Sequence, residues 1–135
     1  FLFFFFQEED GIGNHVRYRG LGNVYKSQGT KVVVVLGHTA CGAVKGACDD
    51  AKLGNLTALL SKIKPAVNAV TSPSDPSLRN SKNIDFVNEV AAKNVHLTID
   101  NIRTQSPVLK ELEDSNAIKI VGAMYDINNG VVTFY

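Results

Sequence analysis

The sequence predicts an α/β fold, with a mainly parallel central sheet flanked by helices and a C-terminal β-hairpin or edge strand. Three observations support this prediction. Residues 32–36 are four valines and a leucine, a run typical of a central parallel strand covered on both faces. Apolar residues then recur at helical spacing over several segments. Near the C-terminus, Asn128-Asn129-Gly130 follows the last long apolar strand as a hairpin turn signal.

The N-terminal segment predicts turns and short strands. The run from Phe1 to Phe6 is shorter than the roughly 20 residues of a membrane span, and it lacks the flanks of a signal peptide. We expect it to be a buried strand or helix segment in the core or an interface. A turn is predicted over 11–14 and a short strand over 15–18. The glycines of 19–23 point to unusual backbone angles, with Arg19 and Asn23 either shaping a functional surface or stabilising the turn.

Helices are predicted over 42–48, 53–70 and 84–103, with a loop over 71–77 between the last two. Pro65 is expected to kink or divide the second of them. The third carries one apolar stripe, made of Val87, Ala91, Val95, Ile99 and Ile102. Ser106 and Pro107 predict the cap and first turn of a further short helix. Strands are expected over 117–125 and 131–135.

Composition limits the possible functions. The chain of 135 residues is long enough to bury one core, so we expect residues 1–135 to form one domain. Its formal net charge is +1, from 14 Lys and Arg against 13 Asp and Glu. Because no basic excess is present to neutralise phosphates, we expect no nucleic-acid partner and no membrane partner. No motif sets the compartment, and a cytoplasmic location is favoured.

An imidazole and a thiol stand where the buried strand gives way to a helix. Gly37 ends the strand, His38 follows it, and Cys41 comes three positions later, near the start of the next helix. The unpaired N–H groups of a helix N-terminus favour the thiolate, the form of cysteine that binds zinc. Taken alone, the two residues are more often a buried structural pair. The alternative is a pair of metal ligands.

The other cysteine and histidines have weaker claims to a metal. If Cys48 lies on one helix with Cys41, the two are roughly 10 Å apart along its axis, too far for a disulfide or for one zinc ion. We therefore expect Cys48 to be a small buried hydrophobic residue. His96 is expected on the flank of the long helix rather than at a metal. His15, the remaining histidine, is a candidate for a further metal ligand.

The segment Gly37-His38-Thr39-Ala40-Cys41-Gly42-Ala43-Val44 strongly resembles the second zinc motif of the β-class carbonic anhydrases, in which a hydrophobic strand ends in G-H-x-x-C-G. The segments 10–14 and 19–23 look like the family's Q-G-x-G-D and R-N-A-G-N. Residues 120–132 are similar to its closing pattern, I-x-G-x-x-Y-D-x-x-x-G-x-V. The likeness covers nearly the whole chain.

This resemblance implies a function and a site. His38 and Cys41 would be zinc (Zn2+) ligands, and the reaction would be the reversible hydration of carbon dioxide to bicarbonate and a proton. Gly42 would be a catalytic residue whose backbone N–H approaches the reacting oxygen, or a glycine that simply allows the strand-to-helix turn. Family members are dimers or larger, so the resemblance also implies a homodimer or homotetramer.

Two departures from the family pattern leave alternatives open. The family takes its third zinc ligand, with an orienting aspartate and arginine, from a C-x-D-S-R motif that would fall before Phe1. It also carries a helix between the positions of Asn23 and Gly37 that has no counterpart here. Either the chain is part of a longer protein or it is a natural minimal homologue. A complete chain of this kind predicts little or no hydratase activity. The alternatives are a non-catalytic assembly module, or a hydrolase of carbon disulfide or carbonyl sulfide on the same fold.

Overall fold

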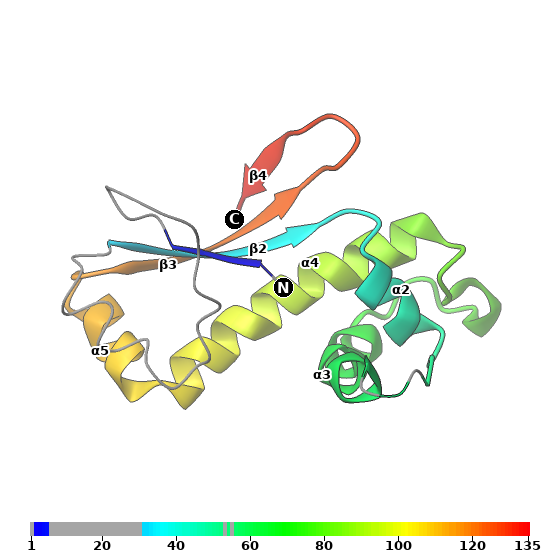
Figure 1. Ribbon diagram of the computed structural model, residues 1–135, viewed down its shortest axis with the longest axis horizontal. Coiled ribbons are helices and arrows are strands. Elements are labelled where there is room, and N and C mark those ends of the chain that lie inside the picture. The colour runs from blue at the N-terminus through cyan, green and yellow to red at the C-terminus, as the bar shows by residue number, and fades with distance from the viewer. Residues whose placement is uncertain (1, 6–30, 53, 55) are drawn as a thin grey trace.

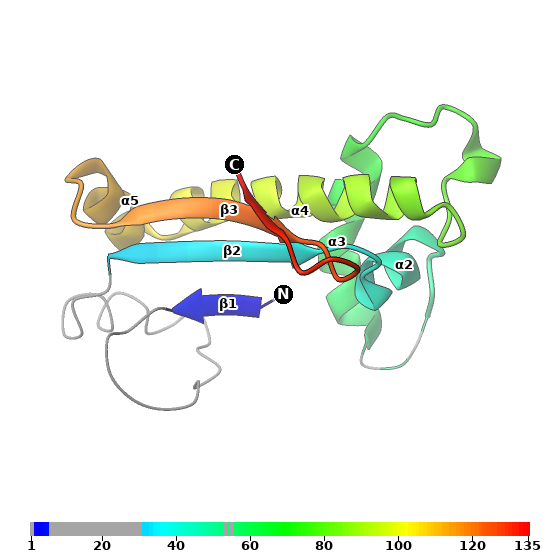
Figure 2. The same cartoon turned by 90° about the horizontal axis from the view of Figure 1, so that it is seen from above.

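A computed structural model of the protein describes residues 2–5, 31–52, 54 and 56–135. The helices lie against one face of a sheet and at one end of it (Figure 1). In chain order the elements are β1 (Leu2–Phe5), β2 (Val32–His38), α2 (Gly42–Cys48), α3 (Leu56–Ala69), the 3-10 turn η1 (Pro76–Leu78), α4 (Ile84–Gln105), α5 (Pro107–Asp114), β3 (Lys119–Tyr125) and β4 (Val132–Phe134). The helix α4 runs beneath β2 and β3, and α2 and α3 lie beyond the carboxyl end of β2 (Figures 1 and 2).

The described strands form a sheet of order β1-β2-β3-β4. The central pair is parallel, with Val32 opposite Lys119 and His38 opposite Tyr125, whereas β1 and β4 pair antiparallel at the two edges. The predicted α/β fold and C-terminal hairpin are confirmed, but the sheet is mixed rather than mainly parallel, because β2–β3 is the one parallel pair among the described strands. The helices α2 to α5 lie between β2 and β3 in the chain, and they supply the long connection that parallel pairing needs. A tight turn joins β3 to β4, so these two strands can pair only antiparallel.

The strand β2 is buried on both faces, as its valine run predicts. Successive side chains of a strand point to opposite faces, and Val33, Val34 and Val35 are only 2%, 7% and 1% exposed. The predicted strand and hairpin at the C-terminus are also present, with the left-handed φ of +76° at Gly130 in the turn. The phenylalanine run contributes β1, which is one of the two conformations expected for it.

One face of the central strands packs on the C-terminal half of α4 and on α5. We call this cluster the sheet core; its members are Val33, Val35, Val95, Ile99, Ile102, Leu109, Ile118 and Ile120. Two glycines let α4 approach the sheet closely. A Cβ at Gly37 would lie 2.7 Å from Val95 Cγ2, and one at Gly122 would lie 3.0 Å from Val95 Cγ1. Any larger residue at these positions would push the helix and the sheet apart.

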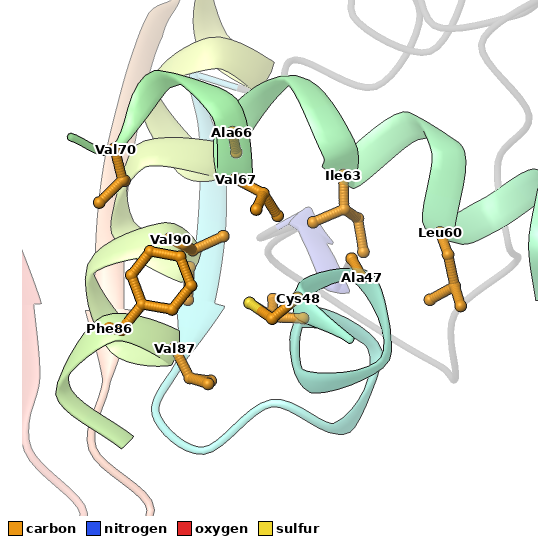
Figure 3. Close-up of a cluster of buried hydrophobic side chains, with 12 residues drawn as sticks. Ala47, Cys48, Leu60, Ile63, Ala66, Val67, Val70, Phe86, Val87 and Val90 are labelled. Carbon is orange, nitrogen blue, oxygen red and sulfur yellow. The ribbon is translucent and has the colours of Figure 1, made fainter. Parts of the chain in front are cut away.

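A second cluster joins α2, α3 and the N-terminal half of α4 (Figure 3). We call it the helical core; its members are Val44, Ala47, Cys48, Leu60, Ile63, Ala66, Val67, Val70, Phe86, Val87, Val90 and Ala91. The whole predicted apolar stripe of α4 is buried, divided between the two cores. The helix α3 continues through Pro65, so the predicted division of this helix is wrong, and its start falls at Leu56 rather than at Leu53.

Polar side chains fix the ends of the helices. Asn83 Oδ1 accepts a hydrogen bond from Phe86 N at 3.2 Å, which caps α4, and Ser106 Oγ accepts one from Leu109 N at 3.4 Å, which caps α5 as predicted. Arg79 donates to the carbonyl oxygens of Val67 and Val70 at the end of α3, at 2.9 and 2.7 Å. Among the described residues, no helix is long and apolar enough to cross a membrane.

Candidate functional site

The His38–Cys41 segment connects the end of β2 to the start of α2. His38 is the last residue of β2, and Cys41 is the N-cap of α2. Because β2 and β3 run parallel, the segment emerges at their shared carboxyl edge, where ligand sites of α/β sheets usually lie. The turn holds Ala40 in the left-handed region, at φ +53°. This conformation strains the backbone of a residue that has a Cβ, so contacts with neighbouring residues must stabilise the turn.

Hydrogen bonds fix this segment from two sides. On the hairpin side, Thr39 N donates to Tyr125 O at 3.0 Å, and Thr39 Oγ1 donates to Asp126 Oδ1 at 3.3 Å. The same Oγ1 accepts from Ile127 N at 3.1 Å. On the helix side, Ala40 N donates to Asn88 Oδ1 on α4 at 2.8 Å. The strained turn is therefore attached both to the hairpin and to the long helix.

The hydrogen bond of the His38 ring selects its tautomer. Its Nδ1 lies 2.9 Å from the carbonyl oxygen of Thr39. A carbonyl oxygen only accepts, so Nδ1 carries the proton and donates it. The lone pair then lies on Nε2, which makes this nitrogen the atom free to bind a metal. His38 as a whole is an exposed residue.

Cys41 keeps its sulfur out of the helix-capping hydrogen bonds. Its side chain makes no cap hydrogen bond to α2, while its carbonyl accepts from Lys45 N at 2.9 Å and begins the helix. The thiol is free and half-buried. Cys41 and His38 thus both offer an uncommitted donor atom, one borderline-soft nitrogen and one soft sulfur, which is a combination that zinc favours.

The two side chains share one small pocket, of about 30 Å³. Its other lining residues are Leu36, Gly37, Ala43, Val44, Ile63, Ala91 and Asn94. The lining is therefore mostly apolar, with His38, Cys41 and Asn94 as its polar members. One buried water needs about 10–15 Å³ by the same measure, so the pocket suits a molecule of very few atoms.

Three solved structures are similar to this chain in fold. The β-carbonic anhydrase CafA of Aspergillus fumigatus matches with 25% identity and a TM-score of 0.71, covering 83% of this chain and 51% of that one. A tetrameric β-carbonic anhydrase of Sordaria macrospora matches with 22% identity and a TM-score of 0.67, covering 84% and 56%. A Coccomyxa β-carbonic anhydrase in complex with acetazolamide matches with 18% identity and a TM-score of 0.66, covering 84% and 50%.

The family model described as carbonic anhydrase matches residues 23–132. The chain belongs to the β-class carbonic anhydrase family. No sequence among the curated proteins matches it. The chain spans about half the length of these β-carbonic anhydrase structures.

The nitrogen of His38 and the sulfur of Cys41 are donor types that zinc favours, and the described part of the chain brings these two donors to one pocket. Within residues 2–5, 31–52, 54 and 56–135, no group of three or more His, Cys, Asp or Glu residues is arranged to hold a metal ion. The predicted segments 10–14 and 19–23, and the candidate ligand His15, lie outside the described residues.

Three further residues considered in the sequence analysis are Cys48, His96 and Gly42. Cys48 is 7% exposed in the helical core, and burial, with a further contribution from the Asp49 carboxylate, raises the pKa of its thiol to about 11. The ring of His96 packs against that of Tyr135, with centroids 4.5 Å apart. Gly42 is the first residue of α2, is exposed, and has a negative φ, and a Cβ there would meet nothing within 4 Å.

Three residues that the sequence analysis did not single out contribute to the site. Asn88 and Asp126 hold the turn, and Asn94 lines the pocket. The hydrogen bond between Ala40 and Asn88 spans 48 positions of the chain, and the one between Thr39 and Asp126 spans 87. No local sequence pattern predicts contacts over such separations. Asn94 did carry a signal: it is a polar residue within one helical turn of Ala91 and directly before Val95, inside the apolar stripe of α4.

Proposed function

We propose that the protein catalyses the zinc-dependent reversible hydration of carbon dioxide to bicarbonate and a proton, with His38 Nε2 and Cys41 Sγ as two of the zinc ligands. One observation carries this proposal: the two uncommitted donors line the same small apolar pocket at the carboxyl edge of β2 and β3. Membership of the β-class carbonic anhydrase family supplies the reaction. Zinc, when bound, acts as a Lewis acid that acidifies water at neutral pH.

The residues of this chain would position the zinc ligands and admit the substrate. The Nδ1–H bond to Thr39 O fixes the His38 tautomer and orients its ring. The hydrogen bonds of Thr39 and Ala40 fix the turn from which both ligands project. The apolar side chains of Leu36, Val44 and Ile63 give carbon dioxide, a molecule without net dipole, a surface that does not favour water.

The proposed zinc site needs a further ligand, because a catalytic zinc takes about three protein ligands and one open position. We propose that a donor outside the described residues completes it, and His15 is one candidate within the chain. Gly42, next to Cys41, would present its backbone N–H to the reacting oxygen. Apart from its chain neighbours and the backbone of its own helix, nothing lies within 4 Å of the position that a Cβ of Gly42 would take, so the described atoms leave this side of Gly42 open.

Zinc content and carbon dioxide hydration, measured on the same samples of the full-length protein, test the proposal. We expect near-stoichiometric zinc and hydratase activity in the wild type, and the loss of both in His38→Ala and in Cys41→Ala. His96→Ala is the matched control, because its ring packs on Tyr135 and is not part of the pocket lining. Zinc retained at wild-type occupancy in both ligand variants would contradict the assignment.

We further propose that the protein is a homodimer or homotetramer. A solved relative from Sordaria macrospora is described as tetrameric. The C-terminal hairpin of this chain projects from the sheet (Figure 1) and exposes large apolar side chains. They are Ile127, Val131, Val132, Phe134 and Tyr135, each between 42% and 61% exposed. Light scattering of the wild type and of Phe134→Glu tests this, with a shift to smaller species expected in the variant.

A non-catalytic assembly module is the second candidate function. The observation that favours it is the pair of donors, rather than three, among the residues that the structure describes. The same zinc measurement separates the two candidates, because an assembly module of this kind would form the oligomer without stoichiometric zinc.

A further inference from the structure

The side-chain nitrogen of Asn94 is buried, and no described residue accepts a hydrogen bond from it. Asn94 is 5% exposed, and its Nδ2 has no partner among the described residues. An amide donor removed from water without a partner destabilises the fold, so such a group calls for an explanation. Asn94 also lines the same pocket as His38 and Cys41, so it lies at the candidate site.

The surroundings of Asn94 indicate what kind of group would satisfy it. Ala91 and Ile63, which line the same pocket, offer no acceptor side chain, and the backbone oxygen of Asn94 itself accepts a hydrogen bond from Thr98 Oγ1 at 2.7 Å. Asn94 Nδ2 therefore requires a hydrogen-bond acceptor located in the pocket, which has room for a molecule of very few atoms. The donor therefore points to a small oxygen-bearing ligand on the same side of the molecule as the two proposed metal ligands.

We propose that Asn94 is a substrate-positioning residue, whose Nδ2 donates a hydrogen bond to an oxygen of carbon dioxide or bicarbonate held beside His38 and Cys41. This inference rests on the proposed function for its substrate. Asn94 lies on α4, the same helix whose Asn88 fixes Ala40, so one rigid element sets both the turn and the substrate oxygen. The hydrogen bond would orient the planar O–C–O group in an otherwise apolar pocket.

Formate is a suitable probe, because it presents the same O–C–O pair of oxygens and does not react. Its affinity for the full-length, zinc-loaded protein is measured by nuclear magnetic resonance titration with labelled formate, and bicarbonate is added as a competitor. We expect Asn94→Leu to weaken formate binding about tenfold, the effect of one lost hydrogen bond. Iodide, a spherical anion that needs no oriented donor, should bind the variant as it binds the wild type.

The folding stability of the same variant separates positioning from a structural role. If the amide has no partner in the empty pocket, leucine of similar size should leave the thermal midpoint unchanged or raise it. Asn101→Leu is the matched control on α4, since Asn101 is exposed two turns farther along and outside the pocket. Lower stability with unchanged formate affinity in Asn94→Leu would overturn the proposal, as would equal loss of formate and iodide binding.

A measurement on the wild type keeps the proposal testable if the variant does not fold. The Asn94 side-chain amide signals in a nitrogen-labelled sample should shift on addition of formate, and bicarbonate should reverse the shift. Amide signals that stay unchanged at saturating formate would overturn the inference. A wild-type protein without zinc would instead refute the proposed function, so the two failures are distinguishable.

Discussion

The sheet core and the helical core use the same helix in different ways. In the sheet core, the C-terminal half of α4 packs closely on β2 and β3 across glycines. In the helical core, the N-terminal half of α4 packs through Phe86 and valines against two other helices (Figure 3). His38 ends a strand of the first core, and Cys41 begins a helix of the second. The proposed donor pair therefore bridges the two cores, and its geometry depends on how α4 holds them together.

The two cysteines give the largest expected contrast. With a pKa near 11, about one Cys48 thiol in a thousand is ionised at pH 8, and only 7% of the residue is exposed. We expect iodoacetamide to modify Cys41 and to leave Cys48 intact in the native protein, as read by peptide mass spectrometry. Denaturant should make both react, and zinc should protect Cys41. Equal labelling of both cysteines in the native state would mean that the helical core opens readily.

Removing Phe86, the largest fully buried side chain among the described residues, should break the helical core. Phe86 is 1% exposed and also carries the guanidinium of Arg79 over its ring, 4.7 Å from the centroid. Phe86→Ala should lower the free energy of unfolding by about 3–5 kcal/mol in denaturant titrations. The matched control is Leu56→Ala, because Leu56 is 50% exposed at the start of α3. Hydrogen exchange then tells whether β2 remains protected when α2 and α3 loosen; equal loss in both cores would show that they unfold as one unit.

Two glycines on either side of the donor pair should respond differently to the same added methyl group. A Cβ at Gly37 would lie 2.6 Å from Met124 Sδ and 2.7 Å from Val95 Cγ2, so Gly37→Ala should cost about 1–3 kcal/mol of stability. Gly42→Ala meets no atom within 4 Å and should keep or slightly raise stability. Chemical denaturation of both variants checks this. A loss in Gly42→Ala as large as that in Gly37→Ala would refute the difference in packing.

The smallest effect is expected at the ion pair that joins α4 to α5 beside the sheet core. Arg103 Nε and Nη2 donate to the Glu113 carboxylate at 2.8 Å each, and these bonds hold the pKa of Glu113 below its usual 4.5. The pair's contribution is complete above that value and is lost as the pH falls through the lower folded-state pKa. Because both side chains are partly exposed, Glu113→Gln should cost about 1 kcal/mol at neutral pH.

Unfolding measured from pH 7 down to pH 3 checks this ion pair. The difference between wild type and Glu113→Gln should stay constant down to about pH 5 and then shrink. Asp114→Asn is the control, because its pair with Lys110 is more exposed and should contribute less than about 0.5 kcal/mol. A difference that grows as the pH falls would have the wrong sign for a carboxylate with a lowered pKa.

The sequence by itself determined the elements and the donor pair. The apolar stripe placed α4 within a few residues, the continuous valine run placed β2, and the Ser106 cap with Pro107 placed the start of α5, because each of these signals is local in the chain. The strand end, glycine and helix start around His38 and Cys41 are likewise local. Cys48 was correctly predicted as a buried residue from its spacing along the helix.

Only the tertiary structure decided that β1 pairs with β2 and what surrounds the donors. The parallel β2–β3 pair and the antiparallel β3–β4 hairpin agree with the lengths of their connections, which the sequence indicated, whereas side-chain periodicity does not encode the pairing partner of β1. The fixing of the turn by Asn88 and Asp126, and the buried amide of Asn94, depend on α4 and the hairpin meeting the turn in space. Such contacts join residues far apart in the chain, so only packing brings them together.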